Sequence, residues 1–587
     1  MLMRYTNIPL AHTVIQHCKA RGIQHIVISP GSRNAPLTLG FTADPYFRCY
    51  SIVDERSAGF FAMGMAQQLQ KGVAVVCTSG SALLNYYPAV AEAFYSNIPL
   101  LVISADRPGY KIDIGDGQTI RQEDVFHRHL VHSAMLRQDV VHAPEAIRAS
   151  GRSLPAGEAD LRAWQLEIQR YNDSALNEAL SGAHVLQGPV HINVPLEEPL
   201  YQLVDGPIVI PNVDGPPIEG PAPLGSLDHF GKIWAGTDRK MVIIGASPPG
   251  MLDAEHLRAL AGDPSVLVFT ETTSNCHHEE FFPSIDSIIA PIEKAADREQ
   301  RFKELQPGLL ITLGGMVVSK KIKAFLRQYR PEHHWHIGPK NAYDTYYSLT
   351  QHFKATPGTF FKAFSPYLEG RESTYHPTWA AHRERYRERR ADYLGKIEFS
   401  DLLAFYHIQD RIPHGYQLQL ANSSTVRYSQ LFELHPSIKV FCNRGTSGID
   451  GSTSTAIGAS LVEKHPTLLV TGDLSLFYDS NGLWNNYLRP DFRIIVMNNQ
   501  GGGIFRILPG KEDSENFETF FETIQDLDIS KLCGLFGVEH YMASDEKGLL
   551  DILEDFYSPS AAPRLLEVRT PRLVNNKILL TYFDFLS

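Results

Sequence analysis

The sequence contains few cysteines and no long apolar run. Its six cysteines stand apart from one another and none forms a CxxC pair, so neither a disulfide framework nor a paired zinc motif is expected. No stretch approaches the roughly 18 to 20 apolar residues of a membrane span, and the N-terminus lacks the apolar segment and small-residue cleavage site of a secretory signal. We therefore expect a soluble cytoplasmic protein with reduced cysteines.

The sequence also lacks a basic stripe. The formal net charge is −11, from 54 Lys and Arg against 65 Asp and Glu, and the charges are spread along the chain. Nucleic-acid binding requires clustered basic residues, so a nucleic-acid partner is excluded. Hydrophobic residues make up 43% of the sequence, which is ordinary for a globular protein. A chain of 587 residues is too long for a single hydrophobic core.

Apolar strand patterns alternate with helical patterns along the whole chain, which is typical of doubly wound parallel α/β sheets. Two segments interrupt this alternation. Residues 204–225 are rich in Pro and Gly and predict an extended linker, and residues 382–400 are rich in Arg and predict a solvated connecting helix rather than an anion site. Three α/β domains are therefore predicted, at residues 1–200, 201–365 and 366–587.

A carboxylate follows a buried-strand pattern in the last third of the chain. Residues 468–471 lead into Gly472 and Asp473, and 26 residues after Asp473 a second apolar run ends in Asn499, before the glycines at 501–503. One strand-helix-strand unit has about this length, so both polar residues are expected at the ligand-binding edge of a parallel sheet. Carboxylate, amide and loop-carbonyl oxygens suit magnesium holding a diphosphate.

Each of these segments has a simpler interpretation when taken alone. Asp473 could cap the following helix, and the glycines could form a turn. The two features together, at the spacing of neighbouring strands, favour the site for magnesium and diphosphate.

Asp54 and Glu55 lie between a strand pattern and a helix rich in Ala, Gly, Met and Phe. A glutamate there can simply be a favourable charge at a helix N-terminus. If it were buried, it would be suited to share a proton with a ring nitrogen. Glu55 and Asp473, in separate predicted domains, point to one cofactor that uses both.

This combination resembles the thiamin-diphosphate-dependent enzymes, whose metal motif is GD followed by NN. The matching residues here are Gly472-Asp473 and Asn498-Asn499, with Leu474 in place of the glycine that usually follows. A closer resemblance, to the MenD family of menaquinone biosynthesis, runs from about residue 5 to the C-terminus. It is carried by the segments ISPGSRNAPLTLGF, DERSAGFFAMGMA, QTIRQEDVF, NRGTSGIDGSTSTAIG and GDLSLFYDSNGL.

The resemblance implies a pyrimidine-binding domain, a central Rossmann-like domain and a diphosphate-binding domain. It assigns the binding of Mg²⁺ or Mn²⁺ to Asp473, Asn499 and the Gly501 carbonyl. Glu55 would activate the aminopyrimidine ring of thiamin diphosphate, and Ile449 would be the bulky apolar side chain beneath the cofactor.

The resemblance further implies a transferase that decarboxylates 2-oxoglutarate and adds the remaining four-carbon unit to isochorismate. Both substrates carry two carboxylates, so the site needs several cations, ideally arginines. The positions that match the family's substrate contacts are Ser32, Arg33, Arg107, Gln118, Lys320, Lys321, Ser423, Arg427 and Arg444, with Ile504 and Phe505 as apolar walls. An isolated arginine is more often a surface charge or a structural ion pair, and Gly117 departs from the family's Asn.

Two histidine clusters, at residues 275–282 and 333–336, suggest a metal site at first sight. Neither contains an HExxH pattern or a paired CxxC, so structural or surface roles are predicted for them.

The resemblance implies a homodimer or a dimer of dimers, with the Glu55 domain of one subunit facing the Asp473 domain of another. Two other functions stay open. A related thiamin-diphosphate 2-oxo acid decarboxylase or carboligase with a smaller substrate would leave several buried cations unpaired. A non-catalytic cofactor-binding paralogue would not need Glu55, Asp473 and Asn499 together.

Overall fold

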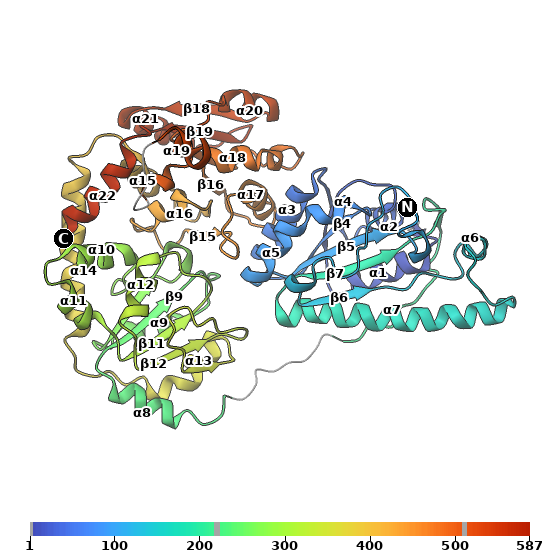
Figure 1. Ribbon diagram of the computed structural model, residues 1–587, viewed down its shortest axis with the longest axis horizontal. Helices are drawn as coiled ribbons and strands as arrows, with labels where there is room; N and C mark the ends of the chain where they lie inside the picture. The colour runs from blue at the N-terminus through green and yellow to red at the C-terminus, as the bar shows by residue number, and fades with distance from the viewer. Residues whose placement is uncertain (1–3, 216–223, 508–513) are drawn as a thin grey trace. The chain divides into compact units, whose positions relative to one another are not determined.

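Three parallel sheets follow one another along the chain (Figure 1). The computed structural model describes residues 4–215, 224–507 and 514–587. Helices alternate with the strands in all three sheets, which confirms the predicted doubly wound α/β class. A short antiparallel pair joins β1 (Tyr5–Thr6) to β8 (Leu203–Val204).

The first sheet has six strands in the order β3-β2-β4-β5-β7-β6. Its central strand β4 reads VAVVC and is buried along its whole length, as expected for a strand covered by helices on both faces. The strands are β2 (His25–Ile28), β3 (Arg48–Ser51), β4 (Val73–Cys77), β5 (Leu100–Asp106), β6 (His132–Met135) and β7 (Val190–Pro195). The helices are α1 (Pro9–Ala20), α2 (Ala35–Ala43), α3 (Glu55–Leu69), α4 (Ser81–Asn85), α5 (Tyr87–Ser96), α6 (Pro144–Ala149) and α7 (Glu158–Leu186).

The central sheet has five strands in the order β10-β9-β11-β12-β13. The strands are β9 (Lys240–Ile244), β10 (Val266–Thr270), β11 (Leu309–Leu313), β12 (His333–Ile337) and β13 (Gln351–Phe353). The intervening helices are α8 (Asp228–Gly236), α9 (Ala254–Ala261), η3 (Thr272–Ser274), α10 (Ile285–Lys294), α11 (Arg298–Leu305), α12 (Lys320–Gln328) and α13 (Pro357–Phe364).

The C-terminal sheet has six strands in the order β15-β14-β16-β17-β19-β18. Counted along the chain, this is the same strand order as in the first sheet. The strands are β14 (Gln417–Leu420), β15 (Lys439–Cys442), β16 (Thr467–Gly472), β17 (Arg493–Asn498), β18 (Glu539–Ala543) and β19 (Arg564–Arg569). The helices are α15 (Asp401–Asp410), α16 (Ser424–Ser429), α17 (Ser452–Ser460), α18 (Asp473–Tyr478), η6 (Gly503–Ile507), α19 (Glu515–Phe517), η7 (Glu518–Glu522), α20 (Ile529–Phe536), α21 (Glu546–Phe556) and α22 (Asn575–Leu586).

The chain forms two compact units. The first is made of Met1–Glu219, Asp450–Lys464 and Asp479–Leu488, and the second of Gly220–Ile449, His465–Tyr478 and Arg489–Ser587. The central and C-terminal sheets belong to the second unit because one continuous apolar core joins them. The domain boundaries expected near residues 200 and 365 lie between sheets and stay predictions. Of the expected linker, residues 216–223 lie outside the described residues.

Helix α17 belongs to the first unit because it packs closely on α3. A Cβ on Gly64 of α3 would lie 2.1 Å from the Thr455 carbonyl oxygen, and a Cβ on Gly458 would lie 2.0 Å from the Phe61 carbonyl oxygen. Glycine at both positions therefore lets the two backbones approach, which explains the small residues of both helices.

The Arg-rich segment forms the second half of α14 (Tyr375–Leu394). It is a helix, as predicted, but only one face is solvated. Trp379, Tyr386 and Tyr393 recur every seven residues and are all buried in the core of the second unit. The expectation of a solvated connecting helix overlooked this aromatic stripe.

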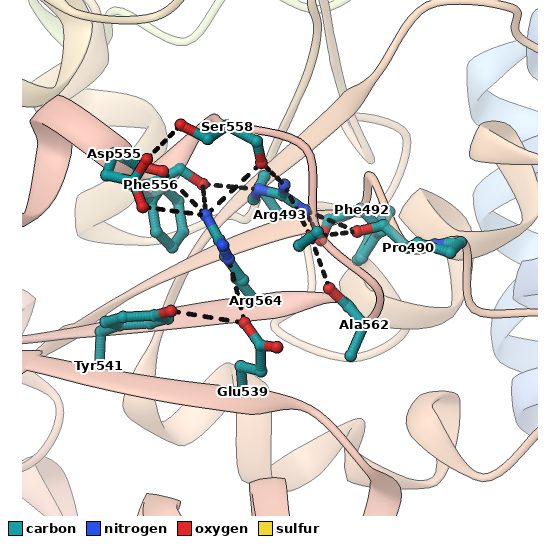
Figure 2. Close-up of polar contacts among 11 residues, drawn as sticks. Pro490, Phe492, Arg493, Glu539, Tyr541, Asp555, Phe556, Ser558, Ala562 and Arg564 are labelled. Atoms are coloured by element: carbon teal, nitrogen blue, oxygen red, sulfur yellow. Dashed lines mark hydrogen bonds and ion pairs between the residues drawn. The ribbon is translucent and has the colours of Figure 1, made fainter.

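Strand β17 is anchored at its first residue, at the end opposite to Asn498 (Figure 2). The guanidinium of Arg493, which is 1% exposed, donates to the carbonyl oxygens of Phe556 and Ser558 at 2.7 and 2.6 Å and to that of Pro490 at 2.8 Å. On neighbouring β19, Arg564 pairs with Glu539 at 3.0 Å. These contacts fix the start of the strand whose other end carries Asn498.

No helix within the described residues has the length and apolar character needed to cross a membrane.

Candidate active site

The ends of two adjacent strands bring Asp473 and Asn499 together. Strands β16 and β17 are parallel, and Gly472 lies opposite Met497 in their register, so the next residues of both strands emerge at the same edge of the sheet. Asp473 is 4% exposed and Asn499 is 7% exposed. The neighbourhood predicted from their spacing is present in the structure.

The carboxylate of Asp473 is incompletely satisfied by the protein. Its Oδ1 accepts a hydrogen bond from the backbone N–H of Leu474 at 2.8 Å, whereas Oδ2 is buried without a hydrogen-bond partner. Burial raises the pKa of Asp473 to about 7, against the opposing effect of backbone N–H groups that include that of Gly501. A buried, unpartnered carboxylate oxygen is costly unless a cation compensates it.

Asn499 is oriented by Asp401, a residue that the sequence interpretation did not single out. The Nδ2 of Asn499 donates to the Oδ2 of Asp401 at 3.0 Å, and the Oδ1 of Asp401 accepts from the Thr570 hydroxyl at 2.6 Å. Burial raises the pKa of Asp401, which is only 2% exposed. Because the amide nitrogen is engaged, the amide oxygen of Asn499 is the atom left for a ligand.

The glycine loop has a backbone conformation that requires glycine. Gly501 has φ +142°, and a Cβ there would lie 2.6 Å from the Glu522 carbonyl oxygen. The same carbonyl accepts a hydrogen bond from the N–H of Gly502 at 2.7 Å. The loop is thus held against η7, with the Gly501 carbonyl close in sequence to Asn499.

These oxygen donors fit a divalent cation. A carboxylate, an amide oxygen and a main-chain carbonyl are the hard ligands that Mg²⁺ or Mn²⁺ prefers. Among the described residues, no group of three or more His, Cys, Asp and Glu side chains is arranged to hold a metal. In one of the two His clusters, His334 and His336 both share hydrogen bonds with the Thr312 hydroxyl, at 2.9 and 3.0 Å.

Apolar side chains lie next to these donors in the second unit. Ile449 is 36% exposed, and its carbonyl oxygen accepts a hydrogen bond from the Ser475 hydroxyl at 2.6 Å, which fixes it beside the first turn of α18. Ile504 and Phe505 on η6 are half-buried, and the Phe505 ring meets that of Phe521 at 6.0 Å.

Glu55 lies in the first unit, at the start of α3. Asp54 caps the helix, because its Oδ1 accepts from the N–H of Ser57 at 3.0 Å and its Oδ2 accepts from the Asn481 amide at 2.6 Å. The Glu55 carboxylate is half-buried and accepts a hydrogen bond of 3.3 Å from Asn85 Nδ2. The full burial considered from the sequence is not observed in this unit.

Arg33 and Arg107 follow β2 and β5 at the same edge of the first sheet. The guanidinium of Arg33 donates to the Leu196 carbonyl oxygen at 3.0 Å and to Glu198 at 2.9 Å. Arg107 donates to the Ser79 hydroxyl at 2.6 Å and to the Gln118 carbonyl oxygen at 2.9 Å.

The neighbouring positions Ser32 and Gln118 are both exposed. The sequence interpretation missed Gln122, whose buried amide holds the N–H of Gly80 at 2.9 Å and Asn193 Oδ1 at 2.7 Å. Gln122 therefore orders the loop at Ser79 and Gly80, to which Arg107 donates a hydrogen bond.

The remaining predicted cations lie in the second unit. Arg444 donates to Asn422 Oδ1 at 2.7 Å. Burial and the neighbouring Arg444 charge lower the pKa of Arg427, on α16 just after Ser423. Lys321 forms an ion pair with Glu293, and Lys320 is exposed.

Comparison with known proteins places the chain in a family. Residues 8–134 match the model of the thiamine pyrophosphate enzyme N-terminal TPP binding domain. The protein named 2-succinyl-5-enolpyruvyl-6-hydroxy-3-cyclohexene-1-carboxylate synthase from Christiangramia forsetii is 51% identical over 586 residues, which cover 100% of both chains. Proteins of the same name from Flavobacterium psychrophilum and Flavobacterium johnsoniae are 50% and 49% identical, again over 100% of both chains.

The chain belongs to the 2-succinyl-5-enolpyruvyl-6-hydroxy-3-cyclohexene-1-carboxylate synthase family.

Membership of this synthase family confirms the resemblance read from the sequence motifs, and the thiamine pyrophosphate match supports the predicted cofactor. The matched region spans Arg33, Glu55, Arg107 and Gln118, so these residues lie in the part of the chain that carries the cofactor-binding signature. The candidate metal ligands Asp473 and Asn499 lie outside it, and the synthase relatives cover these positions by full-length similarity.

Proposed function

We propose that the protein is a thiamin-diphosphate-dependent transferase of menaquinone biosynthesis. It decarboxylates 2-oxoglutarate and adds the four-carbon unit in a 1,4-fashion to isochorismate, giving 2-succinyl-5-enolpyruvyl-6-hydroxy-3-cyclohexene-1-carboxylate and CO₂. The full-length similarity to synthases of that name supports the reaction. Within the structure, the proposal rests on the buried Asp473 Oδ2, which lacks a partner beside the oriented amide of Asn499.

The metal site is assigned to Asp473, Asn499 and the Gly501 carbonyl, which would hold Mg²⁺ or Mn²⁺ together with the diphosphate of the cofactor. Thiamin diphosphate would supply, when bound, a carbon nucleophile and an electron sink for the decarboxylation of a 2-oxo acid. The protein contributes the groups around it. The Glu55 carboxylate would exchange a proton with a ring nitrogen of the cofactor, and the apolar side chain of Ile449 would contact the cofactor.

The substrate carboxylates are assigned to basic and polar side chains of both units. Guanidinium groups bind carboxylates with two parallel hydrogen bonds, which fixes their orientation. Ile504 and Phe505 exclude water from the acceptor side. The residues proposed to contact substrate are Ser32, Arg33, Arg107, Gln118, Lys320, Lys321, Ser423, Arg427, Arg444, Ile504 and Phe505.

We further propose a homodimer, or a dimer of dimers, in which the first unit of one subunit and the second unit of its partner build each active site. Full turnover at a concentration where sedimentation detects only monomer would contradict this arrangement. A cytoplasmic location is also proposed, supported by six free cysteines, because disulfides persist in oxidising compartments.

The test is an assay of the purified protein with thiamin diphosphate, Mg²⁺, 2-oxoglutarate and isochorismate, followed by isochorismate absorbance and product mass. Loss of isochorismate that needs both 2-oxoglutarate and cofactor, with the adduct mass, is expected. CO₂ release without adduct would move the reaction to another acceptor, and no reaction would favour a binding paralogue. Glu55→Gln is expected to lower turnover by at least about a hundredfold, with cofactor binding retained.

A further inference from the structure

The central and C-terminal sheets of the second unit meet through a set of direct hydrogen bonds. The N–H of Thr272, on η3, donates to Gln430 Oε1 at 2.8 Å, and its hydroxyl donates to the Ser429 carbonyl oxygen at 3.0 Å. Asn275 both donates to the carbonyl oxygen and accepts from the N–H of Val440, each at 2.8 Å. The central sheet is therefore fixed against α16 and β15, the elements that carry Arg427 and lead to Arg444.

A buried carboxylate positions the loop before α12 at this junction. Glu271, which is 4% exposed, accepts from the N–H groups of Val318 and Ser319 at 2.7 and 2.8 Å. Ser319 caps α12 through the N–H of Ile322 at 3.1 Å and donates to Asp286. Both carboxylate oxygens of Glu271 and one of Asp286 therefore accept hydrogen bonds from the loop residues Val318 and Ser319.

Lys323 lies in the first turn of α12. It contacts the peptide group between Val317 and Val318, which Glu271 contacts from the N–H side. Its Nζ donates to the Val317 carbonyl oxygen at 2.7 Å, and the N–H of that peptide is the one bound by Glu271. Burial lowers the pKa of Lys323, Glu271 opposes this effect, and the cations Arg444, Arg327 and Arg427 add to the lowering. Among the described residues, the Val317 carbonyl is the only hydrogen-bond partner of this ammonium group.

The two arginines at this junction are also short of partners. The Nε atoms of Arg427 and Arg444 are buried without hydrogen-bond partners, and no described carboxylate lies within ion-pair distance of either guanidinium or of Lys323. Asp286 and Glu271 raise the pKa of Arg427, but from beyond ion-pair distance, and burial and Arg444 outweigh them. Like charges gathered in a partly buried place repel one another, so the arrangement favours an anionic ligand.

We propose that Lys323 is a further substrate-binding cation, the third at this junction, which joins Arg427 and Arg444 in holding a carboxylate of one of the two acid substrates. The proposal rests on the proposed function for the identity of the substrates. Three cations suit a dicarboxylate better than two, since one carboxylate can take a bidentate guanidinium while the other meets a remaining cation.

Lys323 differs from Lys320 and Lys321 in its surroundings. Lys321 is already paired with Glu293, and Lys320 is exposed to solvent. Lys323 instead has a half-buried side chain that is tethered to the Val317 carbonyl and experiences the charges of Arg427 and Arg444. Little conformational entropy is therefore lost when it binds.

The alternative is that Lys323 only holds the Val317–Val318 peptide. Lys323→Gln separates these roles, because glutamine can still donate a hydrogen bond to the carbonyl but carries no charge. Lys323→Arg keeps the charge. Lys303→Met is the matched control, because Lys303 is an exposed lysine on α11 of the same unit.

The experiment measures KM for 2-oxoglutarate and for isochorismate with the holoenzyme containing thiamin diphosphate and Mg²⁺. In Lys323→Gln, the KM of one acid is expected to rise about tenfold to a hundredfold, the loss typical of a charge-assisted hydrogen bond, with kcat within about threefold. Lys323→Arg and Lys303→Met are expected to stay within about threefold of the wild type in both constants. A Gln variant with both KM values within twofold of the wild type would overturn the proposal.

Calorimetric titration of 2-oxoglutarate and of isochorismate into the same holoenzymes measures the affinity for each acid without requiring turnover. If the wild type binds an acid but does not form the adduct, the proposed reaction fails while weaker binding by Lys323→Gln still supports the third cation. Equal binding by Lys323→Gln and the wild type overturns the third cation even if turnover is normal. A wild type that binds neither acid contradicts both proposals.

Discussion

The side-chain amide of Asn499 donates a 3.0 Å hydrogen bond to the buried carboxylate of Asp401. Asp401 is itself held by Thr570 and receives no charge-neutralising contact from a basic side chain among the hydrogen bonds and ion pairs of the described residues. Asp401 would therefore act on the proposed metal site through Asn499, by fixing which amide atom of Asn499 points away from Asp401.

Asp401→Asn is expected to weaken Mg²⁺ binding by about tenfold or more, because an amide in this position no longer fixes the orientation of Asn499. The measurement is the Mg²⁺ concentration that gives half-maximal turnover. The exposed residue Asp392 on α14 provides the control variant Asp392→Asn. If the effect were only structural, kcat at saturating Mg²⁺ would fall while the half-maximal concentration stayed constant.

Asp473→Asn is expected to leave the metal-free protein as stable as the wild type, or more stable, because it removes a buried charge with an unpartnered oxygen. The same variant should lose most of the stabilisation that Mg²⁺ and thiamin diphosphate give to the wild type. Thermal unfolding with EDTA and with both ligands checks the two statements. A large drop in melting temperature in EDTA would show that Asp473 has a structural role instead.

Gly501→Ala is expected to lower the free energy of unfolding by about 1–3 kcal/mol, because it adds a Cβ at a strained positive φ and close to the Glu522 carbonyl. Gly534→Ala on α20 is the control, since it has no atom within 4 Å of the added Cβ and no positive φ. That change should stabilise the helix by about 0.5–1 kcal/mol. Urea unfolding of both variants makes the comparison, and equal effects would contradict the role of the loop geometry.

The stability contributed by Glu271 is expected to depend on pH in the range 4.5 to 7. Burial raises the pKa of Glu271 to about 7 from the ordinary 4.5, with Asp286 adding to this effect and Arg444 opposing it. The folded state then binds more protons than the unfolded state between these values, so the free energy of unfolding falls as pH rises from 4.5 and levels off above 7.

The shift of the Glu271 pKa from 4.5 to about 7 corresponds to a change of about 3 kcal/mol in the free energy of unfolding. Other charged and titratable groups near Glu271 are Lys323, Arg427 and Tyr346. Urea unfolding of the wild type and Glu271→Gln at pH 5, 6, 7 and 8 isolates the Glu271 contribution as the difference between the two curves. A difference that is independent of pH would refute the assignment.

The sequence alone was sufficient to predict the fold class. It also predicted that Asp473 and Asn499 follow the ends of neighbouring strands, because strand ends in parallel sheets have a fixed geometric relation. Asp401 could not be found in the same way. At the start of α15 it resembles any acidic residue in a first helical turn, and only the structure shows that it contacts Asn499 and Thr570, the residues that follow β17 and β19.

The same limit applies to the basic residues. In the SKKIK segment, Lys320, Lys321 and Lys323 look alike in sequence, and their separation depends on which face of α12 meets Glu293, the solvent or the Val317 carbonyl. The buried stripe of α14 was missed for a related reason. Its arginines dominate the composition, although Trp379, Tyr386 and Tyr393 follow the helical period.

The first and C-terminal sheets share one strand order, which is the arrangement that duplication of a single ancestral sheet would leave behind. Corresponding loops can then be compared directly. The segment after the second strand leads to Glu55, at the start of α3, in one sheet and to Arg444 in the other. The segment after the fourth strand carries Arg107 in one sheet and Asn499 in the other. After such a duplication, natural selection would have changed the charge at equivalent positions while the scaffold beneath them stayed constant.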